Sequence, residues 1–164
     1  MHTPPLRYRL IKGFTLIELI FTVALLAVLL SLAAPSFQAL LETQRMRAAA
    51  FDLMADLTLA RNEALKRGAL ATPVTLRPVS GDAGHWESGW SVMVGTEVVS
   101  LKSPVGNGVS FTGPAVITFD RNGRVSNATA VVRFALGNSS ANRSRCISID
   151  PSGRPKSATT ACPT

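Results

Sequence analysis

The sequence has few of the side chains that bind metal ions or act as catalytic nucleophiles and bases. It contains two histidines, His2 and His85, and two cysteines among 164 residues. Two cysteines cannot form a four-cysteine zinc site, and the histidines lie far apart with no ligand spacing around them. Neither a P-loop nor a Gly-x-Ser-x-Gly motif occurs. We therefore expect no enzyme activity, no metal and no cofactor.

Charged side chains are also scarce, although the chain is not poor in apolar ones. Only 16% of the residues are charged and 46% are hydrophobic, a balance that excludes an intrinsically disordered chain. The twelve glycines and ten prolines are too few for a collagen-like or low-complexity sequence. At this length we expect one small folded domain.

The longest apolar stretch lies near the N-terminus, and Glu18 is its only charged residue. Residues 14–34 read FTLIELIFTVALLAVLLSLAA, and a helix of this length spans roughly 30 Å, the hydrocarbon thickness of a bilayer. Arg7, Arg9 and Lys12 precede it, and residues 1–13 contain no acid. The positive-inside rule therefore predicts a single membrane-spanning helix with its N-terminus in the cytoplasm and the rest of the chain outside it.

Two simpler interpretations of this segment leave Glu18 unexplained. One is a cleaved secretory signal with a small-residue site near Ser31, Ala33 and Ala34, and the other is a plain membrane anchor. A carboxylate at the centre of a membrane helix costs about 2.5–3.5 kcal/mol, and less near an end. Such a residue is therefore expected to have a function.

The residues Gly13-Phe14-Thr15-Leu16-Ile17-Glu18 follow the short basic leader, and together they resemble the processing site of type IV pilins and type II secretion pseudopilins. The resemblance implies that a prepilin peptidase cleaves after Gly13 on the cytoplasmic side and methylates the new amine of Phe14. It also implies a bacterial inner-membrane precursor with a periplasmic head, which later joins other pilins through its N-terminal helix in a pilus or pseudopilus.

Glu18 then has an expected role in assembly. A carboxylate in an apolar environment is tolerated when a cation pairs with it, and the ammonium of a processed Phe14 would be that cation. Phe14 and Glu18 are four residues apart on one helix, but the amine of an incoming subunit could also meet a neighbour's Glu18. The resemblance favours the pairing between subunits.

After Pro35 the sequence has the period of an amphipathic helix that ends near Arg67 with Gly68 as its C′ residue. Pro35 should cause a kink or local melting near Ser31. The charged residues between 45 and 66, including Asp56, are expected to form mostly a solvated face. The predicted apolar face is Met46, Ala50, Leu53, Leu57, Ala60 and Ala64.

Beyond Gly68 the period changes from 3.6 to 2, which predicts antiparallel strands at 72–76, 90–94, 98–101, 115–119, 130–136 and 146–149. Asn122-Gly123 predicts a type I′ hairpin turn. His85 and Trp86 are expected in a surface loop, with Trp86 or Trp90 as an alternative core residue. The expected fold is therefore α+β, a pilin-like long helix packed on an antiparallel sheet. Its parts are a leader at 1–13, an assembly helix at 14–35, an amphipathic helix at 36–68 and a β-rich head at 69–164.

Cys146 and Cys162 belong to the segment expected outside the cytoplasm, so we expect them to form a disulfide. The bridge would close a loop of about 17 residues and stabilise the fold by about 3 kcal/mol in the chain-entropy description.

Within the pilin class, ITFDRNGRVS at 117–126 and CISIDPSGRPKS at 146–157 resemble the FimT, FimU and GspH group of minor pilins and pseudopilins. The cysteine pair is more similar to the type IV pilus members of this group. We therefore expect a minor pilin of a type IV pilus, and the alternative is an H-like minor pseudopilin of a type II secretion system.

Positive charge is concentrated after residue 120, where seven Arg or Lys residues face one acid, Asp150. Such a patch suggests an anionic partner. Some FimT-like proteins bind DNA in natural transformation through a Gly-Arg-x-Arg motif, which here reads Gly153-Arg154-Pro155-Lys156. This resemblance implies sequence-independent binding of double-stranded DNA. The alternative is that these cations are solvated or pair with acids on neighbouring pilins. The expected DNA contacts are Arg143, Arg145, Arg154 and Lys156.

Overall fold

The computed structural model describes residues 13–68, 72–81, 84–140 and 142–163. The chain divides into two compact units, with the boundary between Phe37 and Gln38. Helix α1, Leu16–Arg67, is continuous through Pro35 and contributes to both units. The helix bends between Leu32 and Ala34, so the predicted kink near Ser31 is confirmed, while the backbone remains helical there instead of melting. Most of the predicted leader lies outside the described residues.

The first unit contains the apolar part of α1. Its large apolar side chains are exposed in the isolated chain, from Phe14 at 77% to Leu25 at 53%. Among the described residues, no single straight helix is long and apolar enough to cross a membrane. The bent pair Leu16–Leu32 and Ala34–Arg67 satisfies both criteria, by length and composition only.

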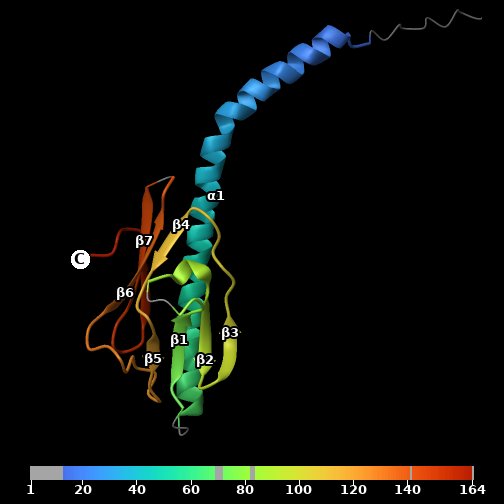
Figure 1. Ribbon diagram of the computed structural model, residues 1–164. Coiled ribbons are helices and arrows are strands. Elements are labelled where there is room, and N and C mark those ends of the chain that lie inside the picture. Colours follow the sequence, from blue (N-terminus) through green and yellow to red (C-terminus); the bar gives the residue numbers. More distant parts are fainter. Residues whose placement is uncertain (1–12, 69–71, 82–83, 141, 164) are drawn as a thin grey trace, which may run out of the picture. The chain divides into compact units, whose positions relative to one another are not determined.

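The second unit is an α+β head in which the C-terminal part of α1 packs along two antiparallel sheets (Figure 1). All six residues of the predicted apolar face are buried, so that prediction is confirmed. The helix ends at Arg67 as predicted, with Lys66 and Arg67 in its last turn, where cations interact favourably with the helix dipole.

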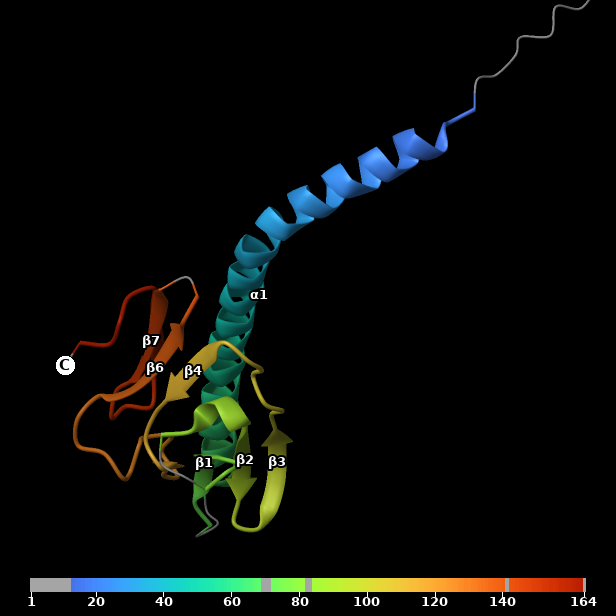
Figure 2. The same ribbon diagram turned by 45° about the horizontal axis from the view of Figure 1, so that its top comes forward.

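Within the described ranges, eight strands form two sheets of four strands each. The first sheet has the order β3-β2-β1-β5 and the second β4-β6-β7-β8, and every pair is antiparallel. Figure 2 shows β6 and β7 of the second sheet to the left of the helix and β3 of the first sheet to its right. The strand bounds are β1 Val74–Pro78, β2 Trp90–Val94, β3 Glu97–Leu101, β4 Val109–Thr112, β5 Ile117–Phe119, β6 Val132–Asn138, β7 Arg143–Ile149 and β8 Pro155–Ala158.

An aromatic cluster fills the space between the sheets. Trp86, in the short 3-10 helix η1 (Trp86–Ser88), packs against Trp90, Phe111 and Phe134, with ring centroids 4.8–6.4 Å apart. Both tryptophans are fully buried, so the expectation of a surface position for Trp86 is wrong. Its indole N–H donates to the carbonyl of Pro114 at 2.9 Å, which satisfies its polar atom inside the core. His85, beside it, is exposed.

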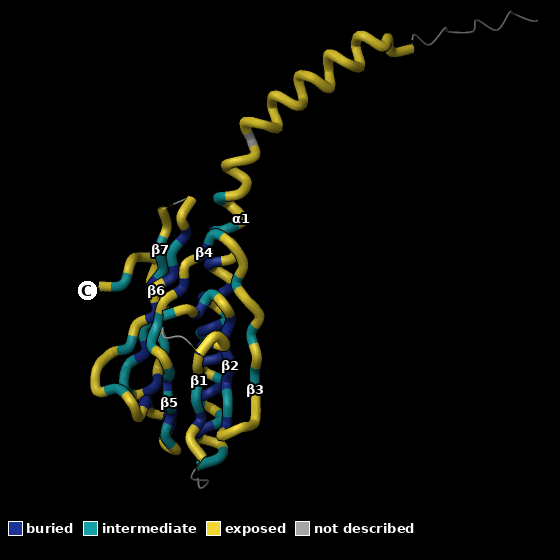
Figure 3. The backbone as a smooth tube through the Cα atoms, viewed as in Figure 1, coloured by how far each residue is buried: buried dark blue, intermediate teal, exposed yellow. Residues whose placement is uncertain are grey.

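Helix α1 is also joined to the sheets by polar contacts. Asp56 is buried and accepts hydrogen bonds from the Trp90 indole N–H at 2.7 Å and from the Ser100 hydroxyl at 2.9 Å. The expectation that Asp56 belongs to a solvated face is therefore wrong, because strands β2 and β3 supply two donors that compensate for its burial. Figure 3 shows buried positions along α1 in the head and exposed positions along its apolar N-terminal part.

Candidate functional site

Three regions carry the candidate functional residues, and the first is the start of α1. Gly13 and Phe14 are exposed and lie just before the helix, which begins at Leu16. A Cβ atom added at Gly13 would meet no other atom within 4 Å. The Gly13–Phe14 peptide bond is thus open to an approaching peptidase in the isolated chain.

Glu18 caps the helix that it belongs to. Its carboxylate Oε2 accepts hydrogen bonds from the Thr15 backbone N–H at 3.3 Å and the Thr15 hydroxyl at 3.2 Å. The Thr15 hydroxyl in turn accepts from the Glu18 backbone N–H at 3.3 Å. This reciprocal pattern is a capping box, and the spacing Thr-x-x-Glu is its sequence signature. In the uncleaved chain, the carboxylate is therefore bound by Thr15 of the same helix.

The second region is the disulfide. Cys146 in β7 is bonded to Cys162, and the two Cα atoms lie 4.8 Å apart. The bridge anchors the segment after β8 to the second sheet. The turn between β7 and β8, which contains Arg154, lies inside the closed loop.

The third region consists of two turns of the same design. Asp120-Arg121-Asn122-Gly123-Arg124 follows β5, and Asp150-Pro151-Ser152-Gly153-Arg154 joins β7 to β8. We call these residues, 120–124 and 150–154, the twin turns. In each, the glycine N–H donates to the carbonyl of the aspartate at 2.9 Å, and the aspartate N–H donates to the carbonyl of the arginine.

The aspartate side chain of each twin turn accepts hydrogen bonds from later residues of the same turn. Asp120 Oδ1 accepts from the backbone N–H groups of Asn122 at 2.8 Å and Arg124 at 2.9 Å. Asp150 Oδ1 accepts from the Ser152 hydroxyl and from the Arg154 N–H. The hydrogen bond from Ser152 and those from the backbone hold the pKa of Asp150 below its ordinary value.

The predicted type I′ turn at Asn122-Gly123 is wrong. A type I′ turn requires positive φ at both central residues, whereas only Gly123 has one, at 68°. An aspartate in the first position favours a type I turn, because its side chain binds backbone N–H groups ahead of it. The glycine then takes the left-handed position that follows.

The twin turns touch each other and α1. A Cβ atom at Gly153 would lie 2.0 Å from the Gly123 carbonyl oxygen, so only glycine permits this approach. The Val125 N–H donates to the Pro151 carbonyl at 3.1 Å. The Arg61 Nε on α1 donates to the Gly123 carbonyl at 3.1 Å. Gly123 and Gly153 are buried, while Arg124 and Arg154, which follow them, are exposed.

The structure divides the four residues expected to bind DNA into two pairs. Arg154 lies at the turn and Lys156 two residues later, where Lys156 and Arg133 flank Ser148 on neighbouring strands. Arg143 lies at the opposite end of β7, about 20 Å from Ile149 at 3.3 Å per residue. Arg143 and Arg145 instead line a pocket with Arg47 of α1, about 330 Å³ in volume.

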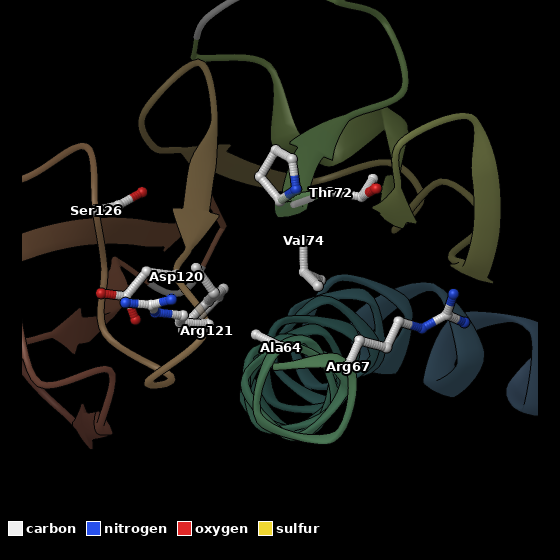
Figure 4. A pocket seen from close by; sticks show the side chains of 9 residues that line it. Ala64, Arg67, Thr72, Val74, Asp120, Arg121 and Ser126 are labelled. Carbon is white, nitrogen blue, oxygen red and sulfur yellow. The ribbon is translucent and has the colours of Figure 1, made fainter. Parts of the chain in front are cut away.

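A different pocket, of about 320 Å³, lies between the end of α1, the start of β1 and the first twin turn. Figure 4 shows Arg67 on one side of it and Asp120 with Arg121 on the other. Arg67 binds Glu63 at 3.0 Å and Glu97 at 2.9 Å. Its guanidinium therefore has two carboxylate partners already.

In the part of the chain that the structure describes, no group of three or more His, Cys, Asp or Glu residues could hold a metal ion. His85 Nδ1 lies 2.8 Å from the Glu87 carboxylate in an exposed segment beside η1. Neither pocket described above contains a histidine or a cysteine.

Two family models match the chain. The model described as type II transport protein GspH matches residues 49–153, well over half of the chain and most of the head. The chain belongs to the GspH family. The prokaryotic N-terminal methylation motif matches residues 8–34, which include Gly13, Phe14 and Glu18. No curated protein and no solved structure shows a significant match.

These matches support the coarser part of the predicted function. The chain is a minor pilin or pseudopilin of the GspH type, a structural rather than an enzymatic family. The methylation motif indicates a membrane-anchored pilin that prepilin peptidase processes and that assembles with other pilins. The GspH match ends at Gly153, so Arg154, Lys156 and Cys162 lie beyond it.

Sequence reasoning missed the capping role of Glu18 and the contact between the twin turns. The first was visible as Thr15-x-x-Glu18, a capping-box spacing hidden by the apolar run around it. The second had a partial signal, since Asp-x-x-Gly-Arg occurs twice, but the contact between the two copies depends on the pairing of distant strands.

Proposed function

We propose that this chain is a minor pilin of a type IV pilus, cleaved after Gly13 and built into the filament through its apolar helix. Before cleavage it spans the inner membrane once, with a cytoplasmic N-terminus and a periplasmic head. The observation that supports this proposal is an open Gly13–Phe14 bond at the start of the apolar segment 14–34, whose only acid is Glu18. The exposed apolar side chains of that helix need either lipid or other pilin helices around them.

Processing can be tested by changing Gly13. We expect Gly13→Val to block cleavage, because its branched side chain would not fit a site selected for glycine, and the precursor would accumulate on a gel. Gly13→Ala is the matched control, since its small side chain should allow cleavage. Normal cleavage of the valine variant would contradict the leader assignment.

The role of Glu18 can be separated into capping and charge. Gln at this position can still complete a capping box but carries no charge, whereas Ala can neither complete the box nor carry a charge. If Glu18 pairs with a processed Phe14 amine of a neighbouring subunit, both Glu18→Gln and Glu18→Ala should insert into the membrane and fail to enter filaments. Normal filament incorporation of Glu18→Gln would show that only capping matters.

The choice between pilus and secretion system rests on the C-terminal disulfide, which makes a type IV pilus member our first candidate and an H-like type II secretion pseudopilin the second. Deleting the gene in its own bacterium and measuring surface pili and secreted enzymes in parallel distinguishes the two. Loss of pili with normal secretion is expected. Loss of secretion alone in the deletion strain would establish the secretion role instead. The same conclusion would follow if the deletion strain had a secretion defect and a Cys146→Ser chain still assembled normally.

We further propose that the head binds double-stranded DNA without sequence preference, through Arg154 and Lys156. The supporting observation is that a rigid turn exposes Arg154, with Lys156 on the following strand. Among the described residues, no ion pair involves either of them. Arg143 and Arg145 would contribute only if one duplex ran along the length of β7.

DNA binding is tested by titrating the full chain in a neutral detergent against a random duplex over a salt series. We expect log K to fall linearly with log salt, by about 0.9 for each phosphate contacted. Arg154→Gln and Lys156→Gln should each flatten the slope. No binding even at low salt would assign the basic residues to contacts with neighbouring pilins.

A further inference from the structure

The twin turns place a second Gly-Arg pair beside the one at Gly153-Arg154. A Cβ atom at Gly153 would lie 2.0 Å from the Gly123 carbonyl oxygen, so the two turns can approach this closely only with glycine at position 153. Each glycine is followed by an exposed arginine. Arg124 and Arg154 therefore start from neighbouring backbone positions, although they are 30 residues apart in the sequence.

The acids of the twin turns leave these arginines available. Asp120 and Asp150 bind backbone N–H groups of their own turns. Among the described residues, no ion pair involves Arg121, Arg124 or Arg154. With Arg61 and Lys156 close by, five cations face two carboxylates at this end of the head.

The backbone that carries the arginines is held from several sides. Arg61 of α1 binds the Gly123 carbonyl, Val125 binds Pro151, and the disulfide closes the loop around the second turn. Because the turns are ordered before any ligand arrives, binding would require little further ordering of the backbone. A fixed pair of cations suits a ligand with regularly spaced negative charges, and along each DNA strand a phosphate recurs every 3.4 Å of helix axis.

We propose that the twin turns form one DNA-binding edge, in which Arg124 contacts a second phosphate beside the one contacted by Arg154. This inference rests on the DNA binding proposed above and adds a residue that lies outside the Gly-Arg-x-Lys segment. Arg121 lies in the first twin turn together with Arg124. It extends the edge toward α1, where it lines the pocket shown in Figure 4.

The test uses the full chain in neutral detergent with the same duplex and salt series. Arg124→Gln and Arg154→Gln should each lower the slope of log K against log salt by about 0.9, and the double variant by about 1.8. Arg124→Lys keeps the charge and should keep most of the slope. Arg45→Gln is the charge-matched control, because the exposed Arg45 lies sixteen residues before Arg61 on α1, about 24 Å along the helix axis.

Each result separates the inference from the proposed function. If Arg154→Gln flattens the slope and Arg124→Gln does not, the edge is wrong while DNA binding stands. If Arg45→Gln acts as strongly as Arg124→Gln, binding follows net charge and the edge is also wrong. If the unmodified chain binds no duplex, both proposals fail. Urea unfolding of each variant shows whether its head is as stable as that of the unmodified chain.

Discussion

Asp56 is the carboxylate that joins α1 to the first sheet through two hydrogen bonds. Both of its oxygens are used, one by the buried indole N–H of Trp90 and the other by the hydroxyl of Ser100. A buried carboxylate without hydrogen-bond donors would strongly disfavour the folded state. The two donors compensate for the loss of hydration and so allow Asp56 to be buried. Asp56 thereby fixes which turn of the helix faces β2 and β3.

We expect Asp56→Ala to lower the free energy of unfolding by about 3 kcal/mol, because it leaves the Trp90 N–H buried without an acceptor. Urea unfolding followed by tryptophan fluorescence measures this. Asp52→Ala, one turn earlier, is the control. Asp52 forms a partly exposed ion pair with Lys102 at 3.0 Å, and its loss should cost only about 0.5 kcal/mol. Equal losses in the two variants would contradict the assignment.

Two constraints require glycine at position 153, one conformational and one steric, and their effects on stability can be measured separately. Its φ of 78° costs any other residue about 1–2 kcal/mol, and its approach to the Gly123 carbonyl leaves no room for a Cβ atom. Gly81 has a similar φ of 74°, but a Cβ atom there would meet nothing within 4 Å.

We therefore expect Gly153→Ala to destabilise the head by about 1–3 kcal/mol more than Gly81→Ala does, as the twin turns are forced apart. The difference between the two urea midpoints measures the steric part alone. Equal effects would mean that the turns can separate without cost.

At the scale of elements, β8 depends on its surroundings more than on its own residues. The sequence Pro-Lys-Ser-Ala has little preference for a strand, and Pro155 stands at the first position of an edge strand, where a missing N–H is tolerated. Two tethers hold it in place: the twin turn before it, and the disulfide that fixes the chain after it. Strand β8 is therefore stabilised from both ends.

Reduction of the disulfide should release this edge. We expect dithiothreitol to lower the free energy of unfolding by about 3 kcal/mol and to increase hydrogen exchange in β8 before the rest of the head. A Cys146→Ala/Cys162→Ala chain is the control, because it should not respond to the reductant. Unchanged exchange in β8 after reduction would show that pairing with β7 suffices.

At the scale of the whole molecule, charge is distributed very unevenly. Residues 14–34 carry one acid and no base, while residues 121–164 carry seven cations and Asp150 alone as an acid. Glu63 on α1 pairs with Arg67, and the hydrogen bond from Arg67 holds the pKa of Glu63 below its ordinary value. Acid should therefore weaken the head as well as raise its positive charge.

The direction of the pH effect follows from the lowered pKa values of Asp150 and Glu63. A carboxyl whose pKa is lowered by folding contributes its full stability above its ordinary pKa of about 4 and loses it as the pH falls through the folded value. We expect the urea midpoint to fall below about pH 5 and this fall to be shallower in Ser152→Ala, which removes the main cause at Asp150. An identical fall in that variant would contradict the role of Ser152.

The sequence by itself determined the elements whose signals are local. The basic leader, Gly13 and Glu18 predict the pilin class, and the spacing of Met46 to Ala64 predicts the buried face of α1, because each pattern involves residues close together in the sequence. Most strands were also predicted, within a few residues of their bounds. Strand β4 was missed because its four residues follow a glycine-rich segment, and β8 because pairing with β7 creates it.

Only the tertiary structure decided the arrangement of the strands into two sheets, the burial of Trp86 and Asp56, and the grouping of the arginines. Strand β1 pairs with β5 about 40 residues later, and no local pattern specifies such a partner. For the same reason the four arginine and lysine residues expected to act together lie at two ends of β7, while Arg124 joins Arg154. Residue type and spacing fix local conformation, but long-range packing fixes which local conformations become neighbours.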